Sequence, residues 1–447
     1  MSINTTARHA LIIAQLAALK ISVGWMYALL SSNFNRITIH ELGIAAVVMT
    51  TMLGVYHLAS PFKVWFGKLS DERPIFGQHR TPYLFIGSML SAVIFPALPS
   101  LAVSMSEGAM WAFIAGYFLL MLYGIGLDVA GSAHYALAAE VLPYNLRGVS
   151  ITAMFTVTIA STILSGVVIK NMMPVYSLEA MQQLYALTPL VVGLSTVFGL
   201  WGVESIDKDA APKKVDAALS GNVFAVMTRM LNGNTETRQF FYFILLSTAG
   251  VFLQDTILEV FGASVLGMSV KETTSFQQLW GSGALLGMMA MGTLTAARPL
   301  NKVHIAIAGN YGTAFGLLML VAVSLSADKT WLYPALLVMG VSTGIHTLGT
   351  VTTMMELTIE NAKATYMGLW GFATMIGHGV ASISSGGLVT LLIEWGQIAQ
   401  TLGYALIFTI EAALLILGAL VLMGIDVKKF QTLNRDELPL SMQAQMD

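Results

Sequence analysis

The sequence has no cysteine and few charged residues. The absence of Cys among its 447 residues excludes disulfide bonds, thiolate catalysis and metal sites with Cys ligands. Charged residues make up only 10% of the chain, whereas soluble domains carry about 25%. The formal net charge of −2 argues against nucleic acid as a partner. The scarcity of charge alone indicates a membrane protein.

The sequence is rich in long apolar runs. Hydrophobic residues make up 56% of the chain, and the mean hydropathy is +0.73. A membrane-spanning helix needs about 20 apolar residues, and the first run lacks the cleavage site of a signal peptide. We therefore predict an all-α integral membrane protein with twelve transmembrane helices, at 10–31, 42–66, 81–103, 109–137, 147–170, 183–203, 239–262, 275–297, 303–325, 331–355, 364–393 and 400–425.

A long polar stretch divides the predicted helices six and six. We predict an N-terminal half at 1–203, a cytoplasmic linker at 204–238, a C-terminal half at 239–425 and a cytoplasmic tail at 426–447. With a cytoplasmic N-terminus, four of the 22 Lys and Arg residues fall outside, at Arg36, Lys170, Lys271 and Lys329, and Lys20 lies within the first helix. Because basic residues concentrate on the cytoplasmic side, both termini are predicted to be cytoplasmic.

The two halves share a spacing of residues. Gly124, Glu140 and Arg147 recur 216 positions later as Gly340, Glu356 and Lys363. These positions close the fourth and tenth helices, which are equivalent if the chain is a duplicated six-helix unit. The repeat supports two related halves with a site between them.

The loop after the second helix carries a recognisable motif. Gly67-Lys68-Leu69-Ser70-Asp71-Glu72-Arg73 is followed by Gly77-Gln78-His79-Arg80. The pattern resembles the loop 2–3 signature of the major facilitator superfamily, G-x-x-x-D-x-R-x-x-x-G-x-x-R. The resemblance implies a bundle of two six-helix halves in which helices 1, 4, 7 and 10 line a central cavity.

Ionisable residues inside the predicted helices fit that plan. Each costs about 2.5–3.5 kcal/mol at mid-bilayer, so it usually faces protein or water. Six such residues fall in helices 1, 4, 7 and 10 and are our candidates for the cavity: Lys20, Asp128, His134, Asp255, Glu259 and His346.

Several of these candidates have a second interpretation. Asp255 and Glu259 are four residues apart and would share a helix face. They could bind protons or pair with Lys20. Alternatively, Glu259 could mark the outer end of helix 7. Asp128 and His134 are six apart and would not share a face. His134 could serve only in helix packing.

Three polar residues fall outside the cavity pattern: His57 in helix 2, His378 in helix 11 and Glu411 in helix 12. Helix 12 normally meets lipid in this fold, so Glu411 could contact another membrane protein or a pigment; alternatively, it hydrogen-bonds back to helix 10 or 11. A histidine could ligate a metal or the magnesium of chlorophyll, or simply pack. We predict no dedicated metal site.

Charges at the cytoplasmic helix ends are candidates for a latch that holds the halves closed. The proposed latch residues are Gly67, Asp71, Arg73, Arg80, Glu140, Arg147, Glu356 and Lys363. The alternative is ordinary surface ion pairing, which contributes little, together with anchoring by basic residues.

A narrower resemblance lies in the second half. The segment from Leu253 to Gly262, LQDTILEVFG, runs into VLGMSV and KETT, and LWGSG follows at 279–283. It resembles the Q-D-x-L-L-E-P-Y-G-G…F-G-L-S-V-x-E-T-T…W-G-x-G stretch of the PucC and LhaA-like family, also called the bacteriochlorophyll delivery family. Arg80-Thr81-Pro82-Tyr83 likewise resembles its R-R-T-P-Y. The departures from the pattern are His79, Val260, Phe261 and Ala263.

The family resemblance implies an assembly factor for light-harvesting antenna complexes in the inner, photosynthetic intracytoplasmic membrane of phototrophic bacteria. It implies antenna polypeptides as partners and (bacterio)chlorophyll as a candidate cofactor. The alternative is a proton-coupled secondary transporter of a small solute, coupled through Asp128, Asp255 or Glu259. The sequence lacks nucleophile–base pairs, metal-ligand spacings and phosphate loops, so we do not expect an enzyme.

Overall fold

The computed structural model describes residues 2–58, 66, 69–205, 223–298, 300–358, 363–427 and 429–430. These residues form helices and short connections. The only β pairing among them is an isolated bridge between Ile75 and Gln78. Gly67, residues 206–222 of the predicted linker and residues 428 and 431–447 of the predicted tail lie outside the described residues.

The helices before the linker begin and end as follows: α1 Ser2–Tyr27, η1 Ala28–Phe34, η2 Ile37–Glu41, α2 Ala46–Leu58, α4 Thr81–Ala92, η3 Phe95–Ala97, α5 Leu98–Ser106, α6 Met110–Val141, α7 Tyr144–Met172, α8 Leu178–Ala186 and α9 Thr188–Leu200. Those after it are α10 Val223–Gly233, α11 Thr235–Phe252, η5 Gln254–Thr256, α12 Leu258–Ser264, α13 Val270–Ala297, α14 Lys302–Ser326, η6 Lys329–Trp331, α15 Leu332–Glu356, α16 Lys363–Val389, η8 Thr390–Trp395 and α17 Gln400–Met423.

Ten helical stretches among the described residues are long and apolar enough to cross a membrane, so the chain is an integral membrane protein. Every predicted range contains helix, but two fall short of this criterion. The second retains a short apolar helix at Ala46–His57. The eighth forms α13, whose first turns carry Lys271, Glu272 and Gln278. Exposed tryptophans lie at helix ends, as at membrane interfaces: Trp111, Trp201, Trp331 and Trp395.

The described chain divides into two compact units that do not follow the predicted halves. Unit 1 contains Met1–Asp216, Asp255–Ser282 and Ser382–Gly403, and unit 2 contains Ala217–Gln254, Gly283–Ala381 and Tyr404–Asp447. Segments from the predicted seventh, eighth and eleventh helices thus pack with the N-terminal helices.

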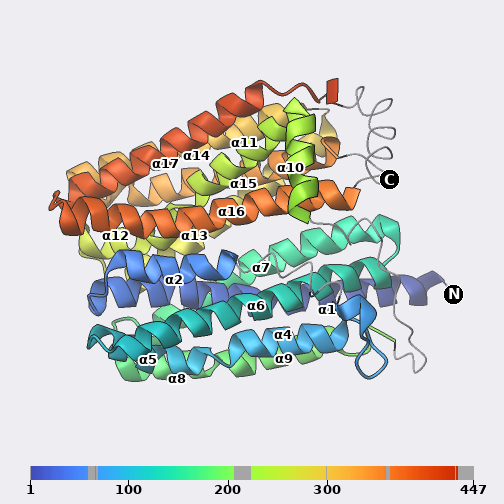
Figure 1. Cartoon of the computed structure of the whole chain (residues 1–447), viewed down its shortest axis with the longest axis horizontal. Helices are drawn as coiled ribbons and strands as arrows, with labels where there is room; N and C mark the ends of the chain where they lie inside the picture. The colour runs from blue at the N-terminus through green and yellow to red at the C-terminus, as the bar shows by residue number, and fades with distance from the viewer. Residues whose placement is uncertain are drawn as a thin grey trace. The chain divides into compact units, whose positions relative to one another are not determined.

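Within unit 1, α1 packs against α7 and α9, and α4 packs against α6 and α9 (Figure 1). Small residues allow the close crossing of α4 and α6. A Cβ on Gly126 would lie 2.6 Å from the carbonyl oxygen of Gly87. Aromatic residues fill the core between these helices, with the Tyr123 and Phe95 ring centroids 5.8 Å apart.

Within unit 2, α14 and α15 pack along their lengths. Gly309 faces the backbone of His346, and Gly349 faces Ala306, so the helices approach too closely for side chains at these glycines. A second aromatic cluster includes Phe240 and Trp370, whose rings meet edge to face at 4.9 Å.

The first helix is longer than predicted. It was expected to end near residue 31 but continues through two π-helical segments to Glu41. The polar run Asn33 to Arg36, expected outside the membrane helix, is buried. Acceptor groups within unit 1 make this possible, because Arg36 bonds to Glu41 and to Met268.

The seventh helix is broken where continuous helix was predicted. α11 ends at Phe252, a 3₁₀ turn covers Gln254–Thr256, and α12 begins at Leu258. Side chains replace the interrupted helical bonds: Gln254 Nε2 donates to the carbonyl of Val251 at 3.3 Å, and Asn35 Nδ2 donates to the carbonyl of Thr256. We expected Asp255 and Glu259 to share one face of a continuous helix. Because the helix is broken between them, they do not.

Candidate functional site

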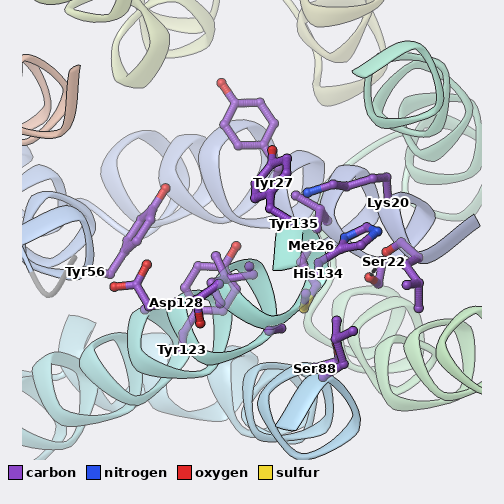
Figure 2. A pocket seen from close by; sticks show the side chains of 18 of the residues that line it. Lys20, Ser22, Met26, Tyr27, Tyr56, Ser88, Tyr123, Asp128, His134 and Tyr135 are labelled. Carbon is purple, nitrogen blue, oxygen red and sulfur yellow. Dashed lines mark hydrogen bonds between the residues drawn. The ribbon is translucent and has the colours of Figure 1, made fainter. Parts of the chain in front are cut away.

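A cavity of about 390 Å³ lies within unit 1, lined by α1, α2, α4 and α6 (Figure 2). It brings together four sequence-predicted residues: Lys20, His57, Asp128 and His134. His57, expected outside the cavity pattern, is one of its lining residues. Figure 2 shows Lys20, His134 and Tyr135 near one another, with Asp128 beside Tyr123.

Aromatic side chains form much of the cavity wall. The Tyr56 ring lies 4.0 Å from the His57 ring and meets Tyr123 edge to face at 5.1 Å. Sites with mostly apolar and aromatic walls and a few polar groups are typical of small-molecule binding. The volume is near the lower end of the usual range of about 300–1,000 Å³, so a tetrapyrrole with a hydrocarbon tail would extend beyond it.

One charged group contacts an aromatic face in this cavity. The Lys20 ammonium lies 4.8 Å from the centre of the Tyr135 ring, within the range of a cation–π interaction. On α6, Asp128 and His134 are both buried and both line the cavity. They were expected on different faces, but their separation of about 120° around the helix still lets both reach a wide cavity.

Asp255 connects the cavity to the break in the seventh helix. Tyr27, a lining residue, donates its hydroxyl hydrogen to Asp255 Oδ1 at 2.7 Å. The next residue, Thr256, is hydrogen-bonded to Ser385 in the same unit. The broken helix therefore places one carboxylate directly behind the cavity wall.

Replacing Tyr27 with phenylalanine should weaken this connection. The change removes a hydrogen bond to a carboxyl group, worth about 1.5–3 kcal/mol when the carboxyl is charged, and keeps the ring. We expect a lower melting temperature in detergent. Tyr123→Phe is the matched control, since the aromatic ring lines the same cavity; an equal loss in both variants would contradict a specific role for the Tyr27–Asp255 bond.

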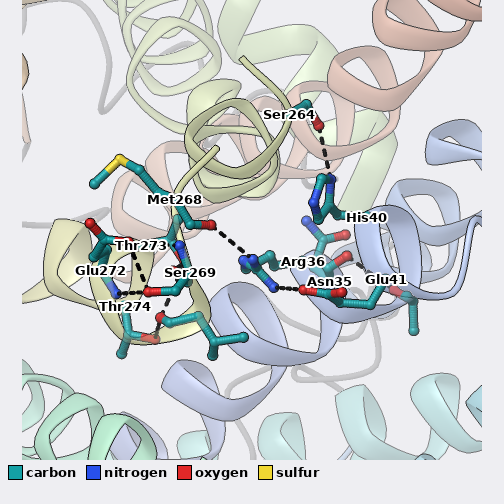
Figure 3. Close-up of polar contacts among 12 residues, drawn as sticks. Asn35, Arg36, His40, Glu41, Ser264, Met268, Ser269, Glu272, Thr273 and Thr274 are labelled. Atoms are coloured by element: carbon teal, nitrogen blue, oxygen red, sulfur yellow. Dashed lines mark hydrogen bonds and ion pairs between the residues drawn. The ribbon is translucent and has the colours of Figure 1, made fainter. Parts of the chain in front are cut away.

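A second polar cluster in unit 1 was missed by sequence reasoning. Arg36 is only 2% exposed; its Nη1 pairs with Glu41 at 2.7 Å and its Nη2 donates to the carbonyl of Met268 at 3.2 Å (Figure 3). His40 Nδ1 lies 3.2 Å from Ser264 Oγ. The available signal was the polar run Asn33 to Arg36, which follows an apolar helix without a Gly or Pro to end it.

Part of the family-like block has a structural explanation. Ser269 and Glu272 form a capping box at the start of α13: Ser269 N–H and Oγ–H donate to Glu272 Oε2, both at 2.8 Å. Thr273 and Thr274 then hydrogen-bond back to carbonyls of the same turn. This part of the motif begins a helix, as Figure 3 shows.

Arg80 is the centre of the predicted latch in unit 1. Its guanidinium pairs with Asp71 and with Glu140 Oε1, the latter at 2.7 Å, and also donates to Ser70. Burial disfavours its charge, but hydrogen bonds and charges from Glu140 and Asp71 outweigh burial and raise the pKa of Arg80.

Glu204, which sequence reasoning assigned only to the linker, caps α4. It accepts the backbone N–H groups of His79, Arg80 and Thr81 at 2.8, 3.0 and 2.6 Å. A carboxylate at a helix N-terminus satisfies unpaired amides and complements the helix dipole. The start of α4 is therefore held by Glu204, four residues after the end of α9.

The other latch residues take separate positions. Arg73 is exposed and its carbonyl accepts from Tyr83 at 2.8 Å, while Arg147 Nε donates to the carbonyl of Leu142 at 3.3 Å. In unit 2, Glu356 pairs with Lys302. The side chain of Lys363 lies outside the described side chains, and Gly67 lies outside the described residues.

Glu259, on α12 in unit 1, is buried and does not line the cavity of that unit. Three further candidates lie in unit 2. His346 is buried beside Phe243, with ring centroids 5.9 Å apart, and the His378 ring lies 3.7 Å from the Phe252 ring. Glu411, for which we expected either an external partner or a hydrogen bond back to helix 10 or 11, is 0% exposed, so its side chain is enclosed by protein. Its oxygens have no hydrogen-bond partner in the described part of the chain. Gly250 on α11 packs against Leu415 and the backbone carbonyl of Glu411 on α17.

In the described ranges, no group of three His, Asp or Glu side chains could hold a metal ion. A metal that brings its own equatorial ligands, as in a tetrapyrrole, needs only one or two ligands from the protein. His57 and His134 in an aromatic cavity are chemically suited to that task.

A family profile described as "PUCC protein" matches residues 33–430. Among curated relatives, an "Uncharacterized protein in puhA-bchM intergenic region" of Rhodobacter capsulatus is 26% identical and covers 92% of this chain and 89% of its own. "Protein PucC" of the same species is 26% identical over 90% of both chains. The "Bacteriochlorophyll synthase 44.5 kDa chain" of R. capsulatus is 24% identical over 92% and 95%.

Solved structures share the fold at low identity. A mutant of the nucleoside transporter NupG has a TM-score of 0.68 at 12% identity, covering 93% of this chain and 99% of its own. The D-xylose-proton symporter has a TM-score of 0.67 at 14% identity, covering 94% and 98%. A POT family transporter in complex with a thioalcohol-conjugated peptide has a TM-score of 0.66 at 14% identity, covering 93% and 95%. At these identities the likeness establishes a transporter-type fold and nothing about cargo.

Proposed function

This chain belongs to the PUCC protein family, and on that premise we propose that it is a membrane assembly factor for photosynthetic light-harvesting antenna complexes. The family match over residues 33–430 carries the proposal. The names of two relatives, which refer to bacteriochlorophyll and to the puhA-bchM region, support a link to photosynthesis. We propose a binding and assembly role without catalysis.

We further propose the membrane arrangement in which this role is exercised. α2 and α13 would complete twelve crossings, in two six-helix halves, in the bacterial inner membrane. Both termini would be cytoplasmic, in keeping with the placement of Lys and Arg. Antenna polypeptides would be its partners at the lipid-facing surface.

The cavity in unit 1 is the proposed pigment site. Its aromatic walls at Tyr56 and Tyr123 suit a flat macrocycle, and His57 or His134 would supply a ligand to magnesium in (bacterio)chlorophyll. Lys20 would contact an acidic or carbonyl group of the same molecule. Because the cavity is smaller than a whole tetrapyrrole, the tail would remain outside it.

The second candidate is a proton-coupled secondary transporter. The transporter-type fold is compatible with it, and the buried contact of Tyr27 with Asp255 offers a coupling group. This candidate predicts uptake of a solute into vesicles that stops in Asp255→Asn. Assembly without transport predicts no such uptake in the wild-type protein.

Removing the gene from its native host tests the proposal. We expect loss of antenna absorption bands with the pigment pathway intact, and recovery of the bands when the wild-type gene is returned. Unchanged antenna absorption in the deletion strain would contradict the assembly role.

Replacing His57 with phenylalanine should lower the pigment that co-purifies by about tenfold or more, because mutation even of the groups that orient a metal ligand typically costs about 10–100-fold in affinity. The change keeps an aromatic ring against Tyr56. His378→Phe is the matched control, since that ring stacks on Phe252 in unit 2. The pigment content per protein, measured by absorption, should fall in His57→Phe and stay unchanged in His378→Phe. An equal fall in both variants would contradict a role for His57 in binding the pigment.

A further inference from the structure

Glu259 on α12 is buried, and its carboxyl group is poorly supplied with hydrogen bonds. It is 6% exposed, and neither carboxylate oxygen has a hydrogen-bond partner of normal geometry in the described residues. Ser32, Arg36 and Asp255 are the polar groups that act on it. A carboxylate removed from water without hydrogen bonds is strongly disfavoured, so the neutral acid is the form that suits this environment.

Arg36 is the positively charged group that acts on Glu259, and its guanidinium is bonded to other groups. The guanidinium of Arg36 pairs with Glu41 at 2.7 Å and donates to the carbonyl of Met268 at 3.2 Å, while its Nε has no partner among the described residues. Figure 3 shows the side chain directed toward Met268, with Glu41 nearby. Arg36 therefore retains an unused donor in a buried position.

Glu41 and Glu259 differ in how well they tolerate loss of the guanidinium. Glu41 is 30% exposed, so water can solvate its charge when Arg36 leaves. Glu259 has no such access, and a buried charge left without its partner is costly. The choice of partner by Arg36 and the protonation of Glu259 are therefore linked.

We infer that Glu259 is a proton-binding site whose occupancy is set by the partner of Arg36. While Arg36 pairs with Glu41, Glu259 is a neutral carboxylic acid. When Arg36 turns to Glu259, the O–H bond of the acid breaks, the proton passes to water, and Glu41 remains ionised in contact with solvent. The site requires no pigment and goes beyond the proposed assembly role.

The exchange would also affect the segment after α12. Arg36 holds the carbonyl of Met268, and His40 contacts Ser264 in the same region. The other charged group that acts on Glu259 is Asp255, which accepts from Tyr27. It supplies no hydrogen bond to Glu259.

Infrared difference spectroscopy on the pigment-free protein in lipid vesicles tests the inference. At neutral pH the wild type should show the carbonyl stretch of a protonated carboxylic acid, and Glu259→Gln should remove one component of it. Glu411→Gln is a control, because Glu411 is also buried without hydrogen bonds in the described part of the chain and should remove a separate component. An unchanged spectrum in Glu259→Gln would overturn the inference.

Glu41→Gln tests the exchange itself without disturbing the buried site. Arg36, freed from Glu41, should pair with Glu259, so the Glu259 component of the carbonyl stretch should disappear at the same pH. In Arg36→Gln that component of the carbonyl stretch should remain. A component that persists in Glu41→Gln would overturn the exchange. Since no pigment enters the measurement, its failure would leave the proposed function standing.

Discussion

Replacing Gly287 with alanine is expected to destabilise the protein strongly. A Cβ at this position of α13 would lie 2.0 Å from the carbonyl oxygen of Val341 on α15, which cannot move without shifting a helix. Overpacking of this kind costs about 1–3 kcal/mol, sometimes more. We expect a lower yield of folded protein and a lower melting temperature, measured by intrinsic fluorescence in detergent.

Gly292→Ala is the matched control for this prediction. Gly292 lies on the same helix, and no atom lies within 4 Å of the position that the added methyl group would take. Alanine favours helix over glycine by about 1 kcal/mol, so this variant should be neutral or slightly more stable. Equal losses at Gly287 and Gly292 would show that close α13–α15 packing is not the cause.

Replacing Arg80 with glutamine is expected to produce the second large effect. The change leaves Asp71 and Glu140 facing each other without the guanidinium that both contact. Hydrogen bonds to charged groups contribute about 1.5–3 kcal/mol, reduced here because both carboxylates reach solvent. We expect earlier thermal unfolding and lower antenna assembly in the native host.

Arg80→Lys and Arg73→Gln separate geometry from charge. A single ammonium cannot reproduce the fork that joins Ser70, Asp71 and Glu140, so Arg80→Lys should recover only part of the loss. Arg73 is exposed, and its described contact is through its backbone carbonyl, so Arg73→Gln should have little effect. A large loss of thermal stability in Arg73→Gln together with a small loss in Arg80→Gln would contradict this account of the motif.

The helical membrane fold was predictable because its signals are local. Apolar length located helix in every predicted range, and the Asp71–Arg80 motif identified residues that do form a charge cluster. The Ser269–Glu272 capping box is likewise visible in the sequence as S-x-x-E before a helix. The apolar runs and the capping box depend on neighbours within a few residues, and Asp71 and Arg80 belong to one short loop motif.

Features that depend on distant partners were not predictable. The burial of Arg36 requires Met268, more than two hundred positions away, and the cap on α4 requires Glu204, which follows α9. The break before α12 contains no proline or glycine; its freed carbonyl is satisfied by Asn35 from the first helix. Likewise, the sequence left open whether Glu411 faces a partner or the bundle, because its burial depends on contacts between α17 and other helices.

Gentle extraction of the protein from its native membrane, followed by absorption spectroscopy and mass spectrometry of co-purifying chains, tests the central claim most directly. We predict bacteriochlorophyll-type absorption bands together with antenna polypeptides, and much weaker bands in His57→Phe. A colourless protein without antenna polypeptides would contradict the assembly role and favour the secondary transporter.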